Sequence, residues 1–301
     1  MKELVVVSGK GGTGKTSLTA SFAVLADRPV IADCDVDAAD LHLVLSPRIK
    51  ERHEFRSGHE AIIRQSDCIG CGACLAYCRY DAVKMNGKSA GEARFSIDPV
   101  SCEGCGVCVR FCPQHAIDFP ERLCGEWMIS ETHCGPMVHA RLGIAAENSG
   151  KLVFTVRREA RRIAEEKNHP LVIVDGPPGI GCPVIASLTG ASHVLAVTEP
   201  TLSGCHDLRR VIELTRHFQI PAAVCTNKYD LNVEMTDAIE EEARANGVAI
   251  AGRIRYDQTV TMAQIRGQSV VEFDDSPAAR DIRDVWHVVL SLLNNNKEDR
   301  L

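Results

Sequence analysis

The chain has 301 residues, of which 45% are hydrophobic and 25% charged, and its formal net charge is −6 at pH 7. This length suffices for one large α/β domain or two modest ones, and the negative charge argues against a nucleic-acid-binding surface. The sequence has no run of 18 apolar residues that could span a membrane. It begins with Met-Lys-Glu and then an apolar run, so we expect no signal peptide and a cytoplasmic protein whose 14 cysteines serve mainly as metal ligands.

The first predicted unit is a strand over residues 4–7, a glycine-rich loop and a helix over residues 18–26. The loop fits the P-loop pattern Gly9-x-x-x-x-Gly14-Lys15-Thr16. Such a loop turns backbone N–H groups toward phosphate at the start of a helix. Lys15 is expected to neutralise the β- and γ-phosphates of a nucleotide, and Thr16 to offer its hydroxyl to Mg²⁺. The other predicted phosphate-binding residues are Gly11, Gly12, Thr13, Gly14 and Ser17.

A second lysine near the start of the loop, Lys10, narrows the class. The string Lys-Gly-Gly-Thr-Gly-Lys-Thr resembles the deviant Walker A motif of the MinD/ParA ATPases, the Mrp-type iron–sulfur carriers and the nitrogenase iron protein. The resemblance implies a nucleotide-sandwich dimer, a homodimer or a heterodimer with a similar ATPase. It also implies that Lys10 reaches the phosphates bound by the partner.

A second apolar run, residues 29–32, ends in an acidic cluster that contains Asp33, Asp35 and Asp37. Carboxylates at the end of a strand beside a P-loop fall in the crevice where open α/β sheets bind ligands. By resemblance to the same family, Asp35 is assigned to orienting the attacking water or the Mg²⁺ shell. Asp37 and Asp40 are interpreted as helix-start residues.

From about residue 56 the strand–helix alternation stops and eight cysteines follow in two runs of identical spacing. We call them the first run (Cys68, Cys71, Cys74, Cys78) and the second run (Cys102, Cys105, Cys108, Cys112). This is the bacterial ferredoxin pattern, in which the fourth cysteine of each run ligates the other cluster. The predicted ligands are therefore Cys68, Cys71, Cys74 and Cys112 for cluster one, and Cys102, Cys105, Cys108 and Cys78 for cluster two. Zinc sites normally use two separated CxxC pairs, so two [4Fe–4S] clusters are the preferred interpretation.

The α/β alternation resumes after residue 120. We expect a short strand over residues 152–156 and a charged helix over residues 157–168 whose arginines and glutamates are solvated. The next strand, residues 171–174, ends in Asp175-Gly-Pro-Pro-Gly, where Asp175 looks like the Walker B aspartate that holds the Mg²⁺ shell. A closing helix over residues 277–293 has an apolar face expected to pack on the sheet and not on a membrane, because its acidic and basic residues alternate.

Another predicted strand, residues 222–226, ends in Asn227-Lys-Tyr-Asp. In the family, Asn227 is the residue that reads the nucleotide base. Because Asn-Lys-x-Asp also occurs in guanine-binding GTPases, GTP stays an alternative to the favoured ATP.

Taken together, the chain resembles the MinD-superfamily P-loop ATPases with an inserted two-cluster ferredoxin domain. The implied fold is α/β, a doubly wound, mainly parallel sheet of the deviant Walker A class. The expected domains are residues 1–56 and 121–301 for the ATPase and 57–120 for the insert. The expected function is a slow, Mg²⁺-dependent ATPase coupled to electron transfer through the clusters to a redox or iron–sulfur partner protein. The alternative is an ATPase that delivers iron–sulfur clusters, and neither nucleic acid nor a stable membrane anchor is expected.

Overall fold

The computed structural model describes residues 1–86, 94–143 and 149–295. The chain divides into two compact units. The first unit comprises Met1–His53, Glu126–Arg141 and Ser149–Leu301, and the second comprises Glu54–Gly125 and Leu142–Asn148. The second unit contains the whole of the segment 57–120 that was expected as an insert.

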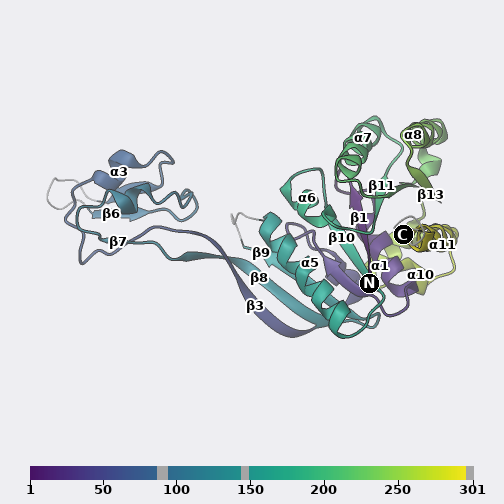
Figure 1. Cartoon of the computed structure of the whole chain (residues 1–301), viewed down its shortest axis with the longest axis horizontal. Helices are drawn as coiled ribbons and strands as arrows, with labels where there is room; N and C mark the ends of the chain where they lie inside the picture. Colours follow the sequence, from purple (N-terminus) through teal and green to yellow (C-terminus); the bar gives the residue numbers. More distant parts are fainter. Residues whose placement is uncertain (87–93, 144–148, 296–301) are drawn as a thin grey trace. The chain divides into compact units, whose positions relative to one another are not determined.

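The first unit is built on a sheet of nine strands in the order β13-β12-β11-β1-β10-β2-β9-β8-β3 (Figure 1). The strands are β1 (Lys2–Ser8), β2 (Val30–Asp33), β3 (Arg48–His59), β8 (Glu121–Glu131), β9 (Pro136–Leu142), β10 (Leu171–Pro178), β11 (His193–Thr198), β12 (Ala222–Asn227) and β13 (Ala249–Ile254). From β13 to β9 all neighbours pair in parallel. The P-loop strand β1 is central, so the predicted mainly parallel α/β fold is confirmed.

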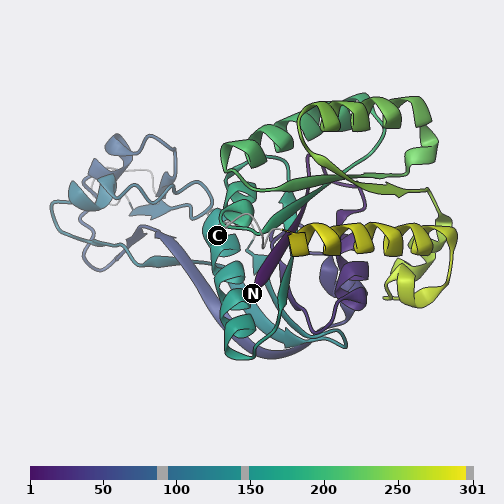
Figure 2. The same cartoon turned by 45° about the vertical axis from the view of Figure 1, so that its right-hand side comes forward.

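Helices cover both faces of this sheet (Figures 1 and 2). They are α1 (Lys15–Leu25), α2 (Leu41–Leu45), α5 (Ser149–Glu166), α6 (Cys182–Leu188), α7 (Leu202–His217), the 3₁₀ turn η1 (Tyr229–Leu231), α8 (Val233–Ala245), α9 (Gln258–Ile265), α10 (Val270–Phe273) and α11 (Pro277–Asn295). Helices α1 and α11 lie on one face, and α5 and α6 lie on the other. The central strands β1, β2, β10 and β11 are buried on both faces, as expected for a parallel sheet, whereas β3 and β8 are largely exposed or half-buried.

The closing helix α11 packs on the sheet as predicted. Ile282, Val285, Trp286, Val289 and Leu293 belong to the buried core that also contains residues of β1, β11 and β12. The ring of Trp286 lies 4.8 Å, centroid to centroid, from that of Phe22 in α1. Over the residues that the structure describes, no helix is both long enough and apolar enough to cross a membrane.

The strand predicted over residues 152–156 is wrong, because this segment is the first part of α5. The run Leu-Val-Phe-Thr-Val is rich in β-branched residues and suggests a strand by local propensity. The buried apolar positions of α5 are nevertheless Leu152, Val153, Val156, Ala160, Ile163 and Ala164, which recur at helical spacing. Packing of this face on the sheet decides the helix.

The second unit consists of short elements around the cysteines. They are β4 (Ile62–Ile63), α3 (Ala73–Tyr77), β5 (Val83–Asn86), β6 (Arg94–Ile97), α4 (Val107–Arg110) and β7 (Ile117–Asp118). Its small core is formed by Ala61, Cys74, Val83, Phe95 and Ile117, with five further cysteines of the two runs packed against them. The rings of Tyr77 and Phe111, each directly before the last cysteine of its run, stack at 4.4 Å.

One buried histidine gives the first unit a predicted pH dependence. His193, at the start of β11, is 3% exposed and neither ring nitrogen has a hydrogen-bond partner among the described residues. Burial lowers the pKa of His193 to about 4 from its usual 6.5. As the pH falls, His193 therefore binds a proton in the unfolded chain before it does so in the folded one. The free energy of unfolding decreases between about pH 6.5 and pH 4, by roughly 3 kcal/mol in total.

The variant His193→Leu is expected to remove this part of the acid sensitivity and to leave the chain at least as stable at neutral pH. Denaturant unfolding followed by tryptophan fluorescence measures it, because Trp127 and Trp286 both lie in the first unit. The exposed His217 provides the control His217→Leu. The prediction would be contradicted if His193→Leu lost as much stability between pH 7 and pH 4 as the unchanged chain.

Candidate functional site

The P-loop joins the end of β1 to the start of α1, as the sequence predicts. Gly14 adopts φ = +85°, in the left-handed region, directly before the helix. A Cβ atom at Gly14 would lie 2.3 Å from Nδ2 of Asn227, which donates to the carbonyl of Thr13 at 2.8 Å. Glycine is therefore required here both by conformation and by the close approach of β12.

Lys15 is buried among carboxylates. Its Nζ lies 2.9 Å from Oδ1 of Asp175 and 3.5 Å from Oδ2 of Asp35. Burial alone would lower the pKa of Lys15, but the carboxylates of Asp175 and Asp35 outweigh burial and raise it. The ammonium group thus stays charged at neutral pH, as a phosphate-binding lysine must.

Asp175 organises the start of α1 from the end of β10. Its Oδ2 accepts a hydrogen bond from the hydroxyl of Thr16 at 2.8 Å, and its Oδ1 accepts one from Thr19 at 2.9 Å. The structure therefore brings Asp175, Thr16 and Lys15 together from segments 160 residues apart. Thr19 was not singled out from the sequence, although it lies one helical turn after Lys15.

The acidic cluster after β2 contributes two side chains to the same place. Burial raises the pKa of Asp35, although the nearby charge of Lys15 partly offsets this effect. Burial also raises the pKa of Asp33 well above its usual range, and the neighbouring carboxylate of Asp175 raises it further. Oδ2 of Asp33 is buried and has no hydrogen-bond partner in the described part of the chain. Asp175 and Asp35 thus share one buried lysine, and the raised pKa of the Asp33 carboxyl group beside them favours its neutral form.

Lys10 lies against the turn that follows β11. Its Nζ is 3.4 Å from Glu199 and 3.3 Å from the hydroxyls of both Thr201 and Ser203. Glu199 also binds Lys228 at 2.5 Å. No role was predicted for Glu199 or Lys228 from the sequence. Each directly follows the carboxyl end of a strand, where ligand-binding residues of open α/β sheets lie, and this position was the available signal.

A cleft of about 610 Å³ lies beside the P-loop at the carboxyl ends of the strands, a volume typical of ligand sites. The predicted residues Gly11, Gly12, Thr13, Gly14, Lys15, Thr16, Ser17, Asp35 and Asn227 line it, together with Arg255, Tyr256 and Gln264. The predicted residues Lys10 and Asp175 do not belong to its described lining. A larger cavity, about 1090 Å³, lies at the amino ends of the strands near Trp286. Of these two cavities, the smaller one is lined by the P-loop.

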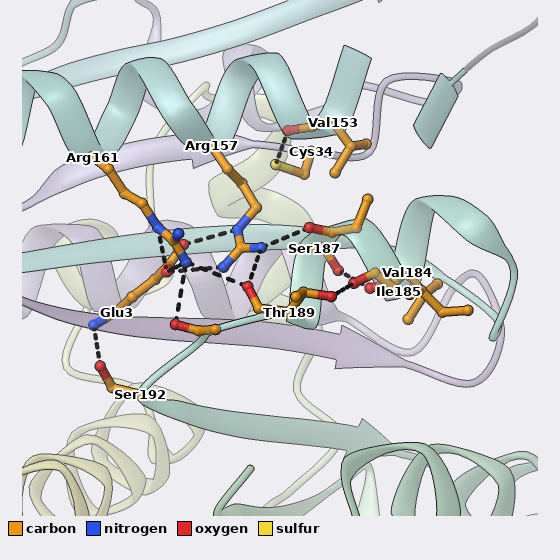
Figure 3. Close-up of polar contacts among 12 residues, drawn as sticks. Glu3, Cys34, Val153, Arg157, Arg161, Val184, Ile185, Ser187, Thr189 and Ser192 are labelled. Carbon is orange, nitrogen blue, oxygen red and sulfur yellow. Dashed lines mark hydrogen bonds and ion pairs between the residues drawn. The ribbon is translucent and has the colours of Figure 1, made fainter. Parts of the chain in front are cut away.

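The helix that follows Asp175-Gly-Pro-Pro-Gly, α6, is held by a buried ion-pair cluster (Figure 3). Arg157 of α5 donates to Glu3 of β1 at 2.9 Å and to the carbonyls of Ala186 and Thr189 at 2.6 and 3.0 Å. Arg161 also binds Glu3. The expectation that the arginines of this helix are all solvated is therefore wrong for Arg157, because its charge pairs with Glu3 from a distant strand.

In the second unit, the eight cysteines of the two runs surround two small cavities. One is lined by Cys68, Cys71, Cys74 and Cys112, and the other by Cys78, Cys102, Cys105 and Cys108. Cys71 and Cys105, the second cysteine of each run, are exposed. Among the described residues, no group of three or more His, Cys, Asp or Glu side chains is arranged to hold a metal ion.

Comparison with known proteins gives one family match and several distant relatives. The family model for the CobQ/CobB/MinD/ParA nucleotide binding domain matches residues 4–270. The uncharacterized protein MJ0578 of Methanocaldococcus jannaschii is 36% identical over 236 residues, which cover 76% of this chain and 79% of that protein. The uncharacterized ATP-binding protein MJ0547 of the same organism is 22% identical, over 94% of this chain and 85% of its own length.

Among solved structures, the septum site-determining protein MinD of Pyrococcus horikoshii, complexed with Mg-ADP, has a TM-score of 0.59 at 16% identity, covering 99% of each chain. The MinC:MinD cell division complex of Aquifex aeolicus has a TM-score of 0.57 at 18% identity, covering 97% of this chain and 96% of that one. At these identities the likeness concerns the fold.

Proposed function

Because the chain belongs to the CobQ/CobB/MinD/ParA nucleotide-binding family and is an ATPase of the MinD/ParA type, we propose that it couples Mg²⁺-dependent ATP hydrolysis to electron transfer through two [4Fe–4S] clusters. The observation that carries the iron–sulfur part is the pair of cavities in the second unit, each lined by four cysteines. The P-loop cleft carries the nucleotide part.

The residues of the cleft fit a nucleotide with Mg²⁺. Asp175 and Asp35 share the single ammonium group of Lys15, and Oδ2 of Asp33 is buried without a partner in the described part of the chain, so a bound cation would satisfy oxygen atoms that the protein leaves uncompensated. In this proposal Thr16 and Asp175 hold the cation. Bound Mg²⁺ would offset the charge that develops on the β- and γ-phosphates. Lys15 binds the same phosphates, and Asp35, whose pKa burial raises, orients the attacking water.

The contacts of Asp230 support adenine over guanine. In the Asn-Lys-x-Asp reading, the carboxylate of Asp230 would face a guanine base. Here Oδ1 of Asp230 accepts a hydrogen bond from the backbone N–H of Tyr256 at 2.7 Å. Asn227 and Lys228 line the cleft, but Asp230 does not belong to its described lining. We therefore keep ATP as the proposed nucleotide, with Asn227 at the base.

The cysteine cavities fit two clusters of four irons. The set at each cavity combines the first three cysteines of one run with the fourth of the other, as the ferredoxin pattern requires. Four thiolates spread around a cavity suit a cluster of several irons, which is larger than one ion.

The strand pairing of the second unit supports the same sets. The strand before the first run, β4, pairs with β7 after the second run. The strand before the second run, β6, pairs with β5 after the first run. Each pairing brings the start of one run next to the end of the other, so the backbone itself favours the crossed combination of ligands.

Two kinds of partner follow from this proposal. One is a second ATPase chain, the same or a similar one, whose phosphates Lys10 would contact in a nucleotide-sandwich dimer. The other is a redox partner protein, which would exchange electrons near the exposed Cys71 or Cys105. Delivery of whole clusters to a partner is the second candidate, and these same exposed ligands are the observation that favours it.

Anaerobically purified protein is expected to contain about eight irons per chain, in two [4Fe–4S] clusters. Addition of MgATP to the reduced protein with an electron acceptor should oxidise the clusters while their iron stays bound, which absorbance and iron analysis measure together. A non-hydrolysable ATP analogue is the control. Two to four metal ions per chain with bound zinc would contradict the iron–sulfur assignment, and iron passing to an apo acceptor would favour delivery.

A further inference from the structure

The two halves of the second unit are related by a repeat that extends beyond the cysteines. Arg64 stands four residues before Cys68, and Asp98 stands four residues before Cys102. The backbone N–H of Arg64 donates to the carbonyl of Ala116, and that of Asp98 donates to the carbonyl of Ala82, both at 2.8 Å. In each half, the residue four positions before one run therefore forms a backbone hydrogen bond with the segment that follows the other run.

The two joints are built on different strand pairs. The longer joint is the ladder of β5 and β6, which pair over four residues, from Val83↔Ile97 to Asn86↔Arg94. The shorter joint is the ladder of β4 and β7, which pair over two, Ile62↔Asp118 and Ile63↔Ile117. Backbone pairing continues beyond the shorter joint, because the N–H of Glu60 donates to the carbonyl of Pro120 at 3.1 Å.

The side chain of Arg64 bridges the shorter joint. Its Nε donates to Asp67, directly before Cys68, at 2.8 Å. Its Nη2 donates to the carbonyl of His115 at 2.6 Å, and its Nη1 binds Asp118. Both of these partners follow Cys112, so one guanidinium ties the start of the first run to the segment that supplies the fourth thiol.

At the longer joint the corresponding residue acts only locally. Asp98 accepts hydrogen bonds from Ser101 at 2.7 Å and from the backbone of Val100 at 3.0 Å, both on its own segment. Lys84 occupies the position that corresponds to Asp118, and no ion pair joins it to Asp98 within the described residues. In the part of the second unit that the structure describes, the side-chain contact across the longer joint is the single hydrogen bond that Asn86 donates to Ser96 at 2.9 Å, whereas the charged, three-way contact of Arg64 belongs to the first half.

We propose that Arg64 is a positioning residue for the first ligand set, which holds Cys112 next to Cys68, Cys71 and Cys74 and so keeps that cluster from opening. The inference rests on the proposed iron–sulfur function. The side chain of Arg64 is 38% exposed, and ion pairs at this exposure contribute little to folding. Loss of the bridge should therefore loosen the joint without unfolding the unit.

Iron release to a chelator from the anaerobic full-length chain tests this role. In Arg64→Gln, about four of the eight irons should be released roughly tenfold faster than in the unchanged chain, and the other four at the original rate. Arg64→Lys keeps the charge but not the three-way contact, so its rate of iron release should lie between the rates of Arg64→Gln and the unchanged chain. The control is Arg56→Gln, since Arg56 is an exposed arginine bound to Glu54 and Glu121 that contacts neither run.

Single-cluster backgrounds identify which cluster responds. Arg64→Gln should accelerate release in a Cys78→Ser chain, which retains the first set, and should have no effect in a Cys112→Ser chain, which retains the second. Unchanged release in Arg64→Gln, or equal acceleration of all eight irons, would overturn the role of Arg64. An unchanged chain that binds no iron would instead refute the proposed function, so the two failures are distinguishable.

Discussion

Replacing Lys15 by alanine is expected to abolish measurable nucleotide binding and hydrolysis. The ammonium group is the one cation within 4 Å of Asp175 and Asp35 among the described ion pairs, so its loss has two effects. The phosphates lose their buried counter-charge, and the remaining carboxylates repel them. Removing one partner of a buried, hydrogen-bonded charge pair costs about 3–5 kcal/mol, and a loss of this size in binding free energy corresponds to about 10²–10⁴-fold in affinity.

Titration with a fluorescent ATP analogue measures this loss, and thermal unfolding of each variant checks that the first unit is folded. Lys167→Ala, at an exposed position after α5, is the matched control. Lys10→Ala should retain binding and hydrolyse more slowly, because Lys10 contacts the turn after β11 in its own chain and is proposed to act on the partner's phosphates. Binding by Lys15→Ala within a few-fold of the unchanged chain would refute the assignment of the cleft. Unaltered hydrolysis by Lys10→Ala would refute the sandwich dimer.

The second large effect concerns the crossed ligands. Cys112→Ser is expected to remove one of the two clusters, about four of eight irons, and the cluster that remains should have the same electron paramagnetic resonance spectrum as in Cys68→Ser. Cys78→Ser should instead match Cys102→Ser. The physical reason is that Cys112 lines the cavity of Cys68, Cys71 and Cys74, whereas Cys78 lines the other.

Cys182→Ser is the matched control, because Cys182 is an exposed thiol in α6, outside both runs. It should retain all iron. A spectrum of Cys112→Ser that matches Cys102→Ser would mean that each run binds its own cluster, and it would also remove the basis for the role of Arg64. Loss of all iron in every cysteine variant would indicate that the unit folds only with both clusters.

Much of the candidate site could be predicted from the sequence because its chemistry is encoded in neighbouring residues. The P-loop and the Asp175 turn are short strings that follow apolar strands, and the parallel sheet then brings their ends together. The spacing of the cysteines likewise predicts the sets that line the two cavities, since three thiols on one short loop can face one cavity while the fourth, after a helical turn, points elsewhere.

The tertiary structure decided what depends on residues far apart in the chain. Helix α5 forms where local propensity favours a strand, because its apolar face packs on the sheet. Arg157 is buried because Glu3, 154 residues away, pairs with it. Asp230 accepts a hydrogen bond from the backbone of Tyr256 and does not belong to the described lining of the P-loop cleft. Arg64 contacts His115 and Asp118 only because β4 pairs with β7. Short motifs carry their own chemistry, whereas the partner of a charge is set by the packing of distant segments, which one sequence does not reveal.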